Sequence, residues 1–100
     1  MTYCGIRYPG GTTMVTTPDG RLLHAARSLC LRNHSPTGFE WGYHGSGPAQ
    51  LALALLLDAT GSDRLSLRLY QQFKAEIVAG WGDAWALESK EIDEWINRHA

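Results

Sequence analysis

Residues 45–59 read GSGPAQLALALLLDA, and this stretch decides the fold. Pro48 suits the first helical position, and Ser46 or Gly47 can cap the helix. From Ala49 to Ala59 nearly every residue is alanine or leucine, so the helix is apolar on all sides. A helix without a polar face has to be enclosed by other elements. We therefore expect a buried central helix around which the rest of the chain packs.

Two amphipathic helices are expected after this stretch. Gly61 ends the buried helix, and Ser62 provides a cap for a second helix over Asp63–Ala79. The apolar residues of that helix recur every four positions, at Leu65, Leu69, Phe73 and Ile77. Ser89 is expected to cap a final helix, whose apolar face comprises Ile92, Trp95 and Ile96. Such spacing predicts helices that each cover a core with one face.

The first residues of the chain favour β structure. Strands are predicted over Tyr3–Tyr8 and over Thr12–Thr17, the second because it is rich in β-branched residues. Pro18-Asp19-Gly20 has the composition of a tight turn. After this turn, Arg21–Ala25 is expected to return as the partner strand of a hairpin.

Three further short strands are candidates. Leu29-Cys30-Leu31 is a brief apolar segment before a polar loop. In Phe39–Tyr43 aromatic residues alternate with other residues, which predicts a strand with its three aromatic side chains on one face. Trp85-Ala86-Leu87 is expected to form a short strand or an extended link. The sequence thus predicts an α+β fold, with a small antiparallel sheet packed against two or three helices.

Length and composition fit one soluble domain over residues 1–100. The chain has a mass of 11.1 kDa, with 44% hydrophobic and 19% charged residues and a net charge of -1. This balance provides no basic field for nucleic acid. No apolar run reaches the roughly 18 residues of a membrane span, and the first residues do not resemble a signal peptide. We therefore expect a cytoplasmic protein with no membrane partner.

The cysteines and histidines do not suggest a metal site. Cys4 and Cys30 are expected to be free, buried thiols, since one disulfide without a secretion signal is a poor fit. Cys30, His34 and His44 are ligand types but lack the paired short spacings of structural zinc sites. We expect no metal and no cofactor.

The glycines before the buried helix form the first candidate site. Gly42, Gly45 and Gly47 lead into the helix N-terminus, where backbone N–H groups and the helix dipole favour an anion. Side chains that can add donors there are those of His44, Ser46 and Gln50. The alternative is that these glycines serve only the close packing of the neighbouring aromatic residues.

A polar loop provides the second half of this candidate site. Arg32, Asn33 and His34 precede the aromatic segment and can contact a polar ligand, although such a loop can also bond only its own backbone. Trp41 or Tyr43 would stack on the ligand, and the combination suits a nucleotide. The expected ligand-binding residues are Arg32, Asn33, His34, Trp41, Tyr43, Gly45, Ser46, Gly47 and Gln50.

Two alternatives use other residues. Glu40 and His44 would serve as acid and base of a small hydrolase if they met in a cleft. Trp81 and Trp85 lie in a connector that contains glycines. If both are exposed they suit a protein interface; otherwise they belong to the core.

Four segments of the chain resemble a small family known only as a domain of unknown function. The longest, Leu31–Leu57, reads LRNHSPTGFEWGYHGSGPAQLALALLL, and His44 stands in it where we expect a glycine. The others are Tyr3–Arg7, Tyr70–Lys74 and the closing Trp85-x-Leu. The family is found in phages, plasmids and other bacterial mobile elements. The resemblance implies an accessory protein that counters host defence inside a bacterial cell.

Residues and resemblance together predict a non-catalytic protein that sequesters a nucleotide-like anionic ligand at the glycine loop. The first alternative is a protein-binding inhibitor of a defence complex, of the anti-CRISPR type, and the hydrolase is the second. The expected partner is therefore a nucleotide-like molecule or a host defence protein. Homo-oligomerisation is a further possibility.

Overall fold

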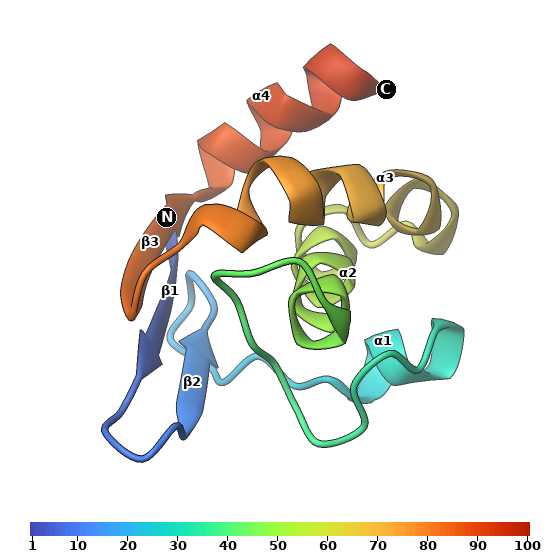
Figure 1. Cartoon of the computed structure of the whole chain (residues 1–100). Helices are drawn as coiled ribbons and strands as arrows, with labels where there is room; N and C mark the ends of the chain where they lie inside the picture. Colours follow the sequence, from blue (N-terminus) through green and yellow to red (C-terminus); the bar gives the residue numbers. More distant parts are fainter.

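The computed structural model describes all 100 residues as three strands and four α-helices, with one short 3-10 helix, η1 (Figure 1). In chain order the elements are β1 (Thr2–Arg7), β2 (Thr13–Thr16), α1 (Ala26–Leu31), α2 (Ser46–Thr60), α3 (Asp63–Glu76), η1 (Val78–Gly80), β3 (Ala84–Glu88) and α4 (Ser89–His99). The sheet is antiparallel with the order β2-β1-β3. The predicted α+β class is confirmed.

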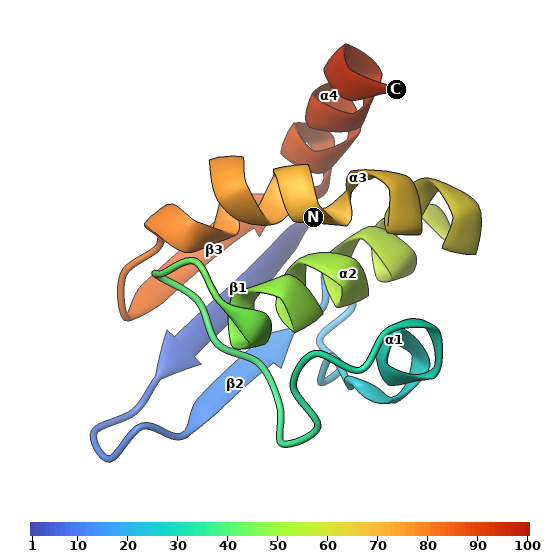
Figure 2. The ribbon, with the colours of Figure 1, turned by 45° about the vertical axis from the view of Figure 1, so that its right-hand side comes forward.

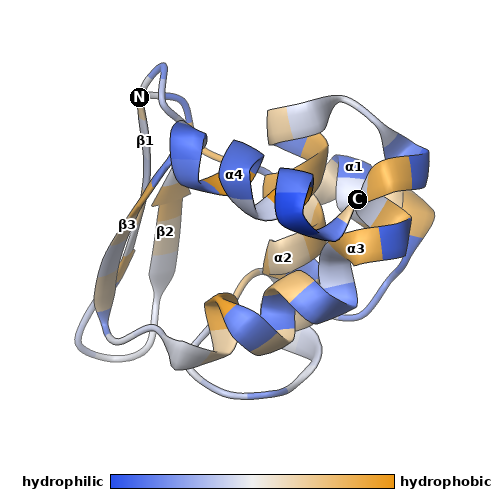
Figure 3. Ribbon diagram, turned by 90° about the horizontal axis from the view of Figure 1, so that it is seen from above, coloured by the Kyte–Doolittle hydropathy of each residue, from blue (hydrophilic) through white to orange (hydrophobic).

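The helices all lie on one side of the sheet, and its other face has no covering layer (Figure 3). The inward-facing side chains of the strands include Tyr3, Val15, Trp85 and Leu87. They join the helices in one core of 19 buried apolar residues. None of the helices combines the length and apolarity needed to cross a membrane.

Helix α2 is the buried central helix that its composition predicts. Every residue from Gly47 to Leu57 is buried, and α1, α3, α4 and η1 all pack against it. The helix begins at Ser46, so Pro48 occupies its third position rather than its first. It ends at Gly61, whose φ of +67° closes the helix in the left-handed region that glycine adopts without strain.

Helix α3 covers α2 with the apolar stripe that the four-residue spacing predicts. The Ser62 side chain accepts a hydrogen bond from the Leu65 amide at 3.1 Å, so the predicted cap is confirmed. The helix ends at Glu76 rather than at Ala79, because η1 tightens the chain before it enters β3. The expected cap at Ser89 is wrong: Glu88 occupies the cap position of α4, and no side chain caps it.

Glycine at position 5 is required by close packing across the sheet. Gly5 pairs with Trp85 on β3, and the Trp85 indole lies over the glycine backbone. A Cβ at position 5 would come within 2.2 Å of this ring. The same indole meets Trp41 edge to face at 5.6 Å and stacks on half-buried Trp81 at 3.9 Å between ring centroids. Trp85 therefore belongs to the core.

The predicted hairpin between Thr12–Thr17 and Arg21–Ala25 is wrong in its second strand. The partner of β2 is β1, joined through the turn that follows Tyr8. Arg21–Ala25 makes one bridge, Thr16 to Leu22, and then leaves the sheet to begin α1. The turn at 18–20 is present, but it leads into a short flap beside the edge of β2.

Two other predicted strands are also wrong. Leu29-Cys30-Leu31 is helical, as the second half of α1. Phe39–Tyr43 is irregular, and Gly42 has a φ of +87°, which is incompatible with a strand. Its aromatic side chains do not share a face, because Trp41 is 1% exposed and Tyr43 is 50% exposed. Cys4 and Cys30 are free thiols as expected, but both are exposed rather than buried.

Candidate binding cleft at the edge of β2

The glycine loop forms a close-packed helix start. A Cβ on Gly45 or Gly47 would come within 2.5 or 2.6 Å of the Tyr43 ring or of Glu40, so both glycines serve packing. Ser46 is exposed at the first position of α2. None of the four cavities in the molecule is lined by residues 45–47.

Gln50 has a structural role. Its side chain is fully buried, and its carbonyl oxygen accepts from the amides of His34 and Ser35, at 2.8 and 3.1 Å. Its amide nitrogen donates to the Ser28 hydroxyl at 2.7 Å. The side chain thus fastens the polar loop and α1 to α2, and it presents no free group to a ligand.

The polar loop does not converge on the glycine loop. Arg32 and Asn33 are exposed, and the Arg32 guanidinium donates to the neighbouring carbonyl of Leu31. The His34 ring faces α3, where Nε2 lies 2.7 Å from the Tyr70 hydroxyl. No cavity is lined by these three residues.

Trp41 is enclosed, so its ring has no face open to a ligand. One side meets Trp85, the Arg7 guanidinium lies 5.0 Å from its centroid, and its Nε1 donates to the Gly82 carbonyl. Tyr43 is the exposed member of the aromatic pair. The expected stacking surface is therefore reduced to Tyr43 alone.

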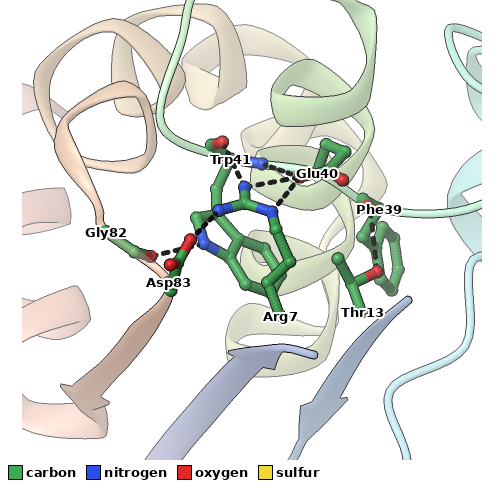
Figure 4. A network of polar contacts seen from close by, with 7 residues as sticks. All are labelled: Arg7, Thr13, Phe39, Glu40, Trp41, Gly82 and Asp83. Atoms are coloured by element: carbon green, nitrogen blue, oxygen red, sulfur yellow. Dashed lines mark hydrogen bonds and ion pairs between the residues drawn. The ribbon is translucent and has the colours of Figure 1, made fainter. Parts of the chain in front are cut away.

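Glu40 is held by Arg7, as Figure 4 shows, and makes no hydrogen bond to His44. The Arg7 guanidinium donates to Glu40 Oε1 at 2.6 and 3.2 Å, and also to the Trp41 carbonyl and to Asp83. The hydrogen bond to Glu40, and then that to Asp83, raises the pKa of Arg7 above its ordinary value. His44 is exposed and makes no hydrogen bond, so the two proposed catalytic groups are not assembled.

The largest cavity lies elsewhere, at the free edge of β2, and has a volume of about 640 Å³. We call it the β2 cleft. Figure 2 shows the segment between α1 and α2 running past β2. The walls come from three separate stretches of the chain: residues 8–15, residues 22–25 and residues 35–40.

Backbone groups of β2 point into the β2 cleft. The Tyr8 amide donates to the Thr12 carbonyl, and the Arg7 amide donates to Asp83 on the opposite side. Because antiparallel strands alternate in this way, the N–H and C=O of Thr13 point away from β1. The same alternation is visible at Val15, whose carbonyl accepts from the Leu23 amide in the flap. Thr13 is thus the unpaired end of an edge strand.

Side chains around this edge are apolar or neutral polar. The wall residues include Met14, Leu22, Leu23 and Phe39, with hydroxyls from Tyr8, Thr12, Thr13, Ser35 and Thr37. The Thr13 hydroxyl spans the cleft floor by donating to the Phe39 carbonyl at 3.0 Å. No lysine or arginine lines the cleft, its one basic side chain is the imidazole of His24, and its one carboxylate, Glu40, is paired with Arg7. The cleft therefore lacks the charge needed to hold a phosphate.

An apolar surface adjoins the cleft. Of the six large apolar side chains that are exposed, four lie on or beside the uncovered face of the sheet: Ile6, Tyr8, Met14 and Leu22. Three of these four also line the β2 cleft. Contiguous exposed apolar patches of this kind are typical of interaction sites. We refer to the outward face of the three strands as the open sheet face.

Sequence reasoning did not identify the β2 cleft. Met14 and Leu22 are apolar residues of predicted strands. The sequence does not show that β2 is an edge strand, because this follows from the strand order β2-β1-β3. The signal that could have found them is the lack of any residue among 12–16 that protects an edge, such as lysine or proline.

Metal-ligating side chains do not gather anywhere in the fold. No group of three or more histidine, cysteine, aspartate or glutamate side chains is arranged to hold an ion. Cys30, His34 and His44 in particular make no such group.

Comparison with known proteins gives one match. A model of a protein family described as being of unknown function matches residues 3–98. No curated protein and no solved structure matches the chain. The matched range includes the whole β2 cleft, the glycine loop and all eight elements except the ends of β1 and α4.

Proposed function

This chain belongs to DUF6166, a family of unknown function, and from its own geometry we propose that it is a non-catalytic protein-binding module. Its ligand is an extended, neutral or basic peptide segment of a partner protein, which lies in the β2 cleft beside Thr13. The observation that carries this proposal is the position of the largest cavity along the unpaired end of an edge strand.

The β2 cleft supplies both kinds of contact that peptide binding by strand addition requires, and this supports the proposal. Main-chain hydrogen bonds provide affinity, and pockets for alternate side chains provide specificity. Thr13 offers one N–H and one C=O, and the apolar and hydroxyl-bearing walls offer the pockets. The exposed side chains of Tyr8, Met14 and Leu22 line the cleft, and Ile6 beside them continues the apolar surface onto the open sheet face.

The nucleotide-like ligand remains a prediction, as does a role in countering host defence. The exposed start of α2 and the exposed Arg32 keep an anion conceivable at the glycine loop, but neither lines a cavity. A peptide-binding module fits the inhibitor alternative better, with a bacterial defence protein in the cytoplasm of a phage or plasmid host as its proposed partner.

The test selects peptides from a random dodecapeptide library on the immobilised protein and maps each hit by amide chemical shifts. We expect neutral or basic peptides that shift the amides of Thr13, Met14 and Leu23. Thr13→Pro removes the N–H that points into the cleft and should weaken binding about tenfold, the value of one hydrogen bond. Thr13→Val keeps the N–H and is the matched control for loss of the hydroxyl.

Two results would overturn the proposal. One is selection of peptides whose shifts lie away from residues 8–15 and 22–25. The other is failure of the selection while a panel of mono- and dinucleotides shifts the amides of residues 45–50, which would favour the sequestration alternative. Circular dichroism of Thr13→Pro checks that the variant is folded, since proline is tolerated at the outward positions of an edge strand.

A further inference from the structure

We propose that β3 pairs with β3 of a second copy of this chain, antiparallel and about a dyad at Ala86, to form a continuous six-stranded sheet. This inference is independent of the proposed function, because it concerns the opposite edge of the sheet. It commits to a second copy as the occupant of that edge.

The free edge of β3 presents unpaired backbone groups over most of its length. The Arg7 amide donates to the Asp83 carbonyl at 2.7 Å, and the Ser89 amide donates to the Met1 carbonyl at 2.9 Å. These two bonds fix the alternation along the strand, so residues 83, 85, 87 and 89 bond β1. The N–H and C=O groups of Ala84 and Ala86 and the N–H of Glu88 therefore point outward, away from β1, whereas the Glu88 carbonyl is at the N-cap of α4 and accepts the first hydrogen bond of that helix.

Nothing in the fold covers this edge. Ala84, Ala86 and Glu88 are exposed, and no helix packs along this edge in Figure 1. The other edge of the sheet is different, because the flap at Arg21–Leu23 bonds the second half of β2. Natural proteins protect open edges with lysine, proline or bulges. Residues 84–88, AWALE, contain no lysine, proline or bulge, and their single charged side chain, Glu88, lies at the last position of the strand.

The arrangement of outward groups is self-complementary. With Ala86 opposite Ala86 of the second copy, Ala84 lies opposite Glu88 in both directions. All three pairs are then at hydrogen-bonded positions; the Ala86 pair gives two bonds, and each Ala84/Glu88 pair gives one, from the Glu88 N–H to the Ala84 carbonyl, so about four bonds form. Such an interface uses the same patch on both copies, as a twofold dimer requires.

Charge and side-chain character agree with this register. The two Glu88 carboxylates lie at opposite ends of the paired strands and face alanine rather than each other. Each is already bonded within its own chain, to the Met1 ammonium at 3.2 Å and to the Thr2 hydroxyl. On the inner side, Trp85 lies opposite Leu87 of the second copy, so the apolar layer continues across the dyad.

The experiment introduces a charged side chain of either sign at Ala86, the residue on the proposed twofold axis. Ala86→Lys and Ala86→Glu each place like charges directly opposite one another in the homodimer, which destabilises a cross-strand pair. We expect wild-type protein to dimerise in sedimentation equilibrium between about 1 µM and about 1 mM, and each variant alone to associate at least tenfold more weakly. An equimolar mixture of the two variants should restore association.

A matched control carries the same two substitutions at an exposed alanine outside the sheet. Ala75 is exposed on α3, so Ala75→Lys and Ala75→Glu should dimerise as wild type does. Wild-type protein that is monomeric throughout overturns the proposal and leaves the β3 edge for a strand of a different protein. A dimer that tolerates both Ala86 variants, or is not restored by mixing them, also overturns it. Peptide binding in the β2 cleft is measured separately and is not affected by either outcome.

Discussion

Gln50 is a buried polar side chain near the start of α2, and its hydrogen bonds hold the fold together rather than contact a ligand. The sequence placed it next to the glycine loop, where a ligand contact was a reasonable expectation. In the structure it satisfies two amides of the polar loop and one hydroxyl of α1. Buried polar groups of this kind stabilise a fold mainly because leaving their partners unsatisfied is costly.

Replacement of Gln50 should therefore affect stability. In Gln50→Leu the His34 and Ser35 amides lose their acceptor, and we expect the free energy of unfolding to fall by about 2–3 kcal/mol. Urea denaturation followed by tryptophan fluorescence measures this loss. Gln71→Leu, at an exposed position of α3, is the control and should change stability by less than about 0.5 kcal/mol. Equal losses in the two variants would contradict the structural role of Gln50.

Between elements, one carboxylate fastens α4 to α3. Glu76 Oε1 accepts from the Trp95 indole at 3.0 Å and lies 3.2 Å from His99 Nε2, while Oε2 accepts from Gln72 at 2.8 Å. The hydrogen bonds from Gln72 and then Trp95, with the charge of His99 in addition, lower the pKa of Glu76 below its ordinary value of 4.5. Asp19 and Glu88 also have lowered pKa values, mainly through hydrogen bonds from Thr17 and Thr2.

These carboxylates predict loss of stability in acid. A carboxyl group whose pKa is lower in the folded protein than in the unfolded chain adds to the free energy of unfolding at pH values above its unfolded pKa. That stabilisation is lost as the pH falls through the pKa of the folded state. We expect the urea midpoint to be steady from pH 7 to 5 and to fall below pH 4.5. Glu76→Gln should make that fall shallower, whereas Glu94→Gln, which removes an exposed carboxylate with no hydrogen bond or ion pair, should not. A midpoint that rises on acidification would contradict this prediction.

The elements that could be predicted from the sequence are those with local signals. The all-apolar run specified α2, the Ser62 cap and the four-residue spacing specified α3, and the β-branched residues specified β2. The elements that could not are decided by distant contacts. Residues 29–31 become helical where Ser28 meets Gln50. Phe39–Tyr43 leaves strand geometry because Arg7 and Gly82 hold Glu40 and Trp41 from other parts of the chain.

At the scale of the whole molecule, a single core joins the sheet to α2, α3 and α4. Its tryptophans report on different parts: Trp41 meets Trp85 of β3 edge to face, and Trp95 of α4 packs against Phe73 of α3. We expect one cooperative unfolding transition, with coincident midpoints by tryptophan fluorescence and by far-ultraviolet circular dichroism. Separate transitions would show that α4 unfolds independently of the remaining core.

The candidate site was harder to predict than the fold. The β2 cleft is assembled from three stretches that are distant in the sequence, and its defining feature is the strand order. The expected site residues were chosen from their chemical type and their place in the sequence, which do not show their partners in the fold. Two of them have partners dozens of residues away: the His34 ring lies against the Tyr70 hydroxyl, and Trp41 is buried with its indole nitrogen bonded to the Gly82 carbonyl.

The strand order β2-β1-β3 separates the cleft from the open edge by the full width of the sheet. Two molecules joined at β3 carry their clefts at the two outermost edges of one sheet, facing apart. Such a pair acts as a divalent clamp: a partner that displays the recognised segment twice is held by avidity, because the second contact forms at the high effective concentration set by the first. A partner with a single segment gains nothing from the pairing, so valence becomes a means of discriminating between targets.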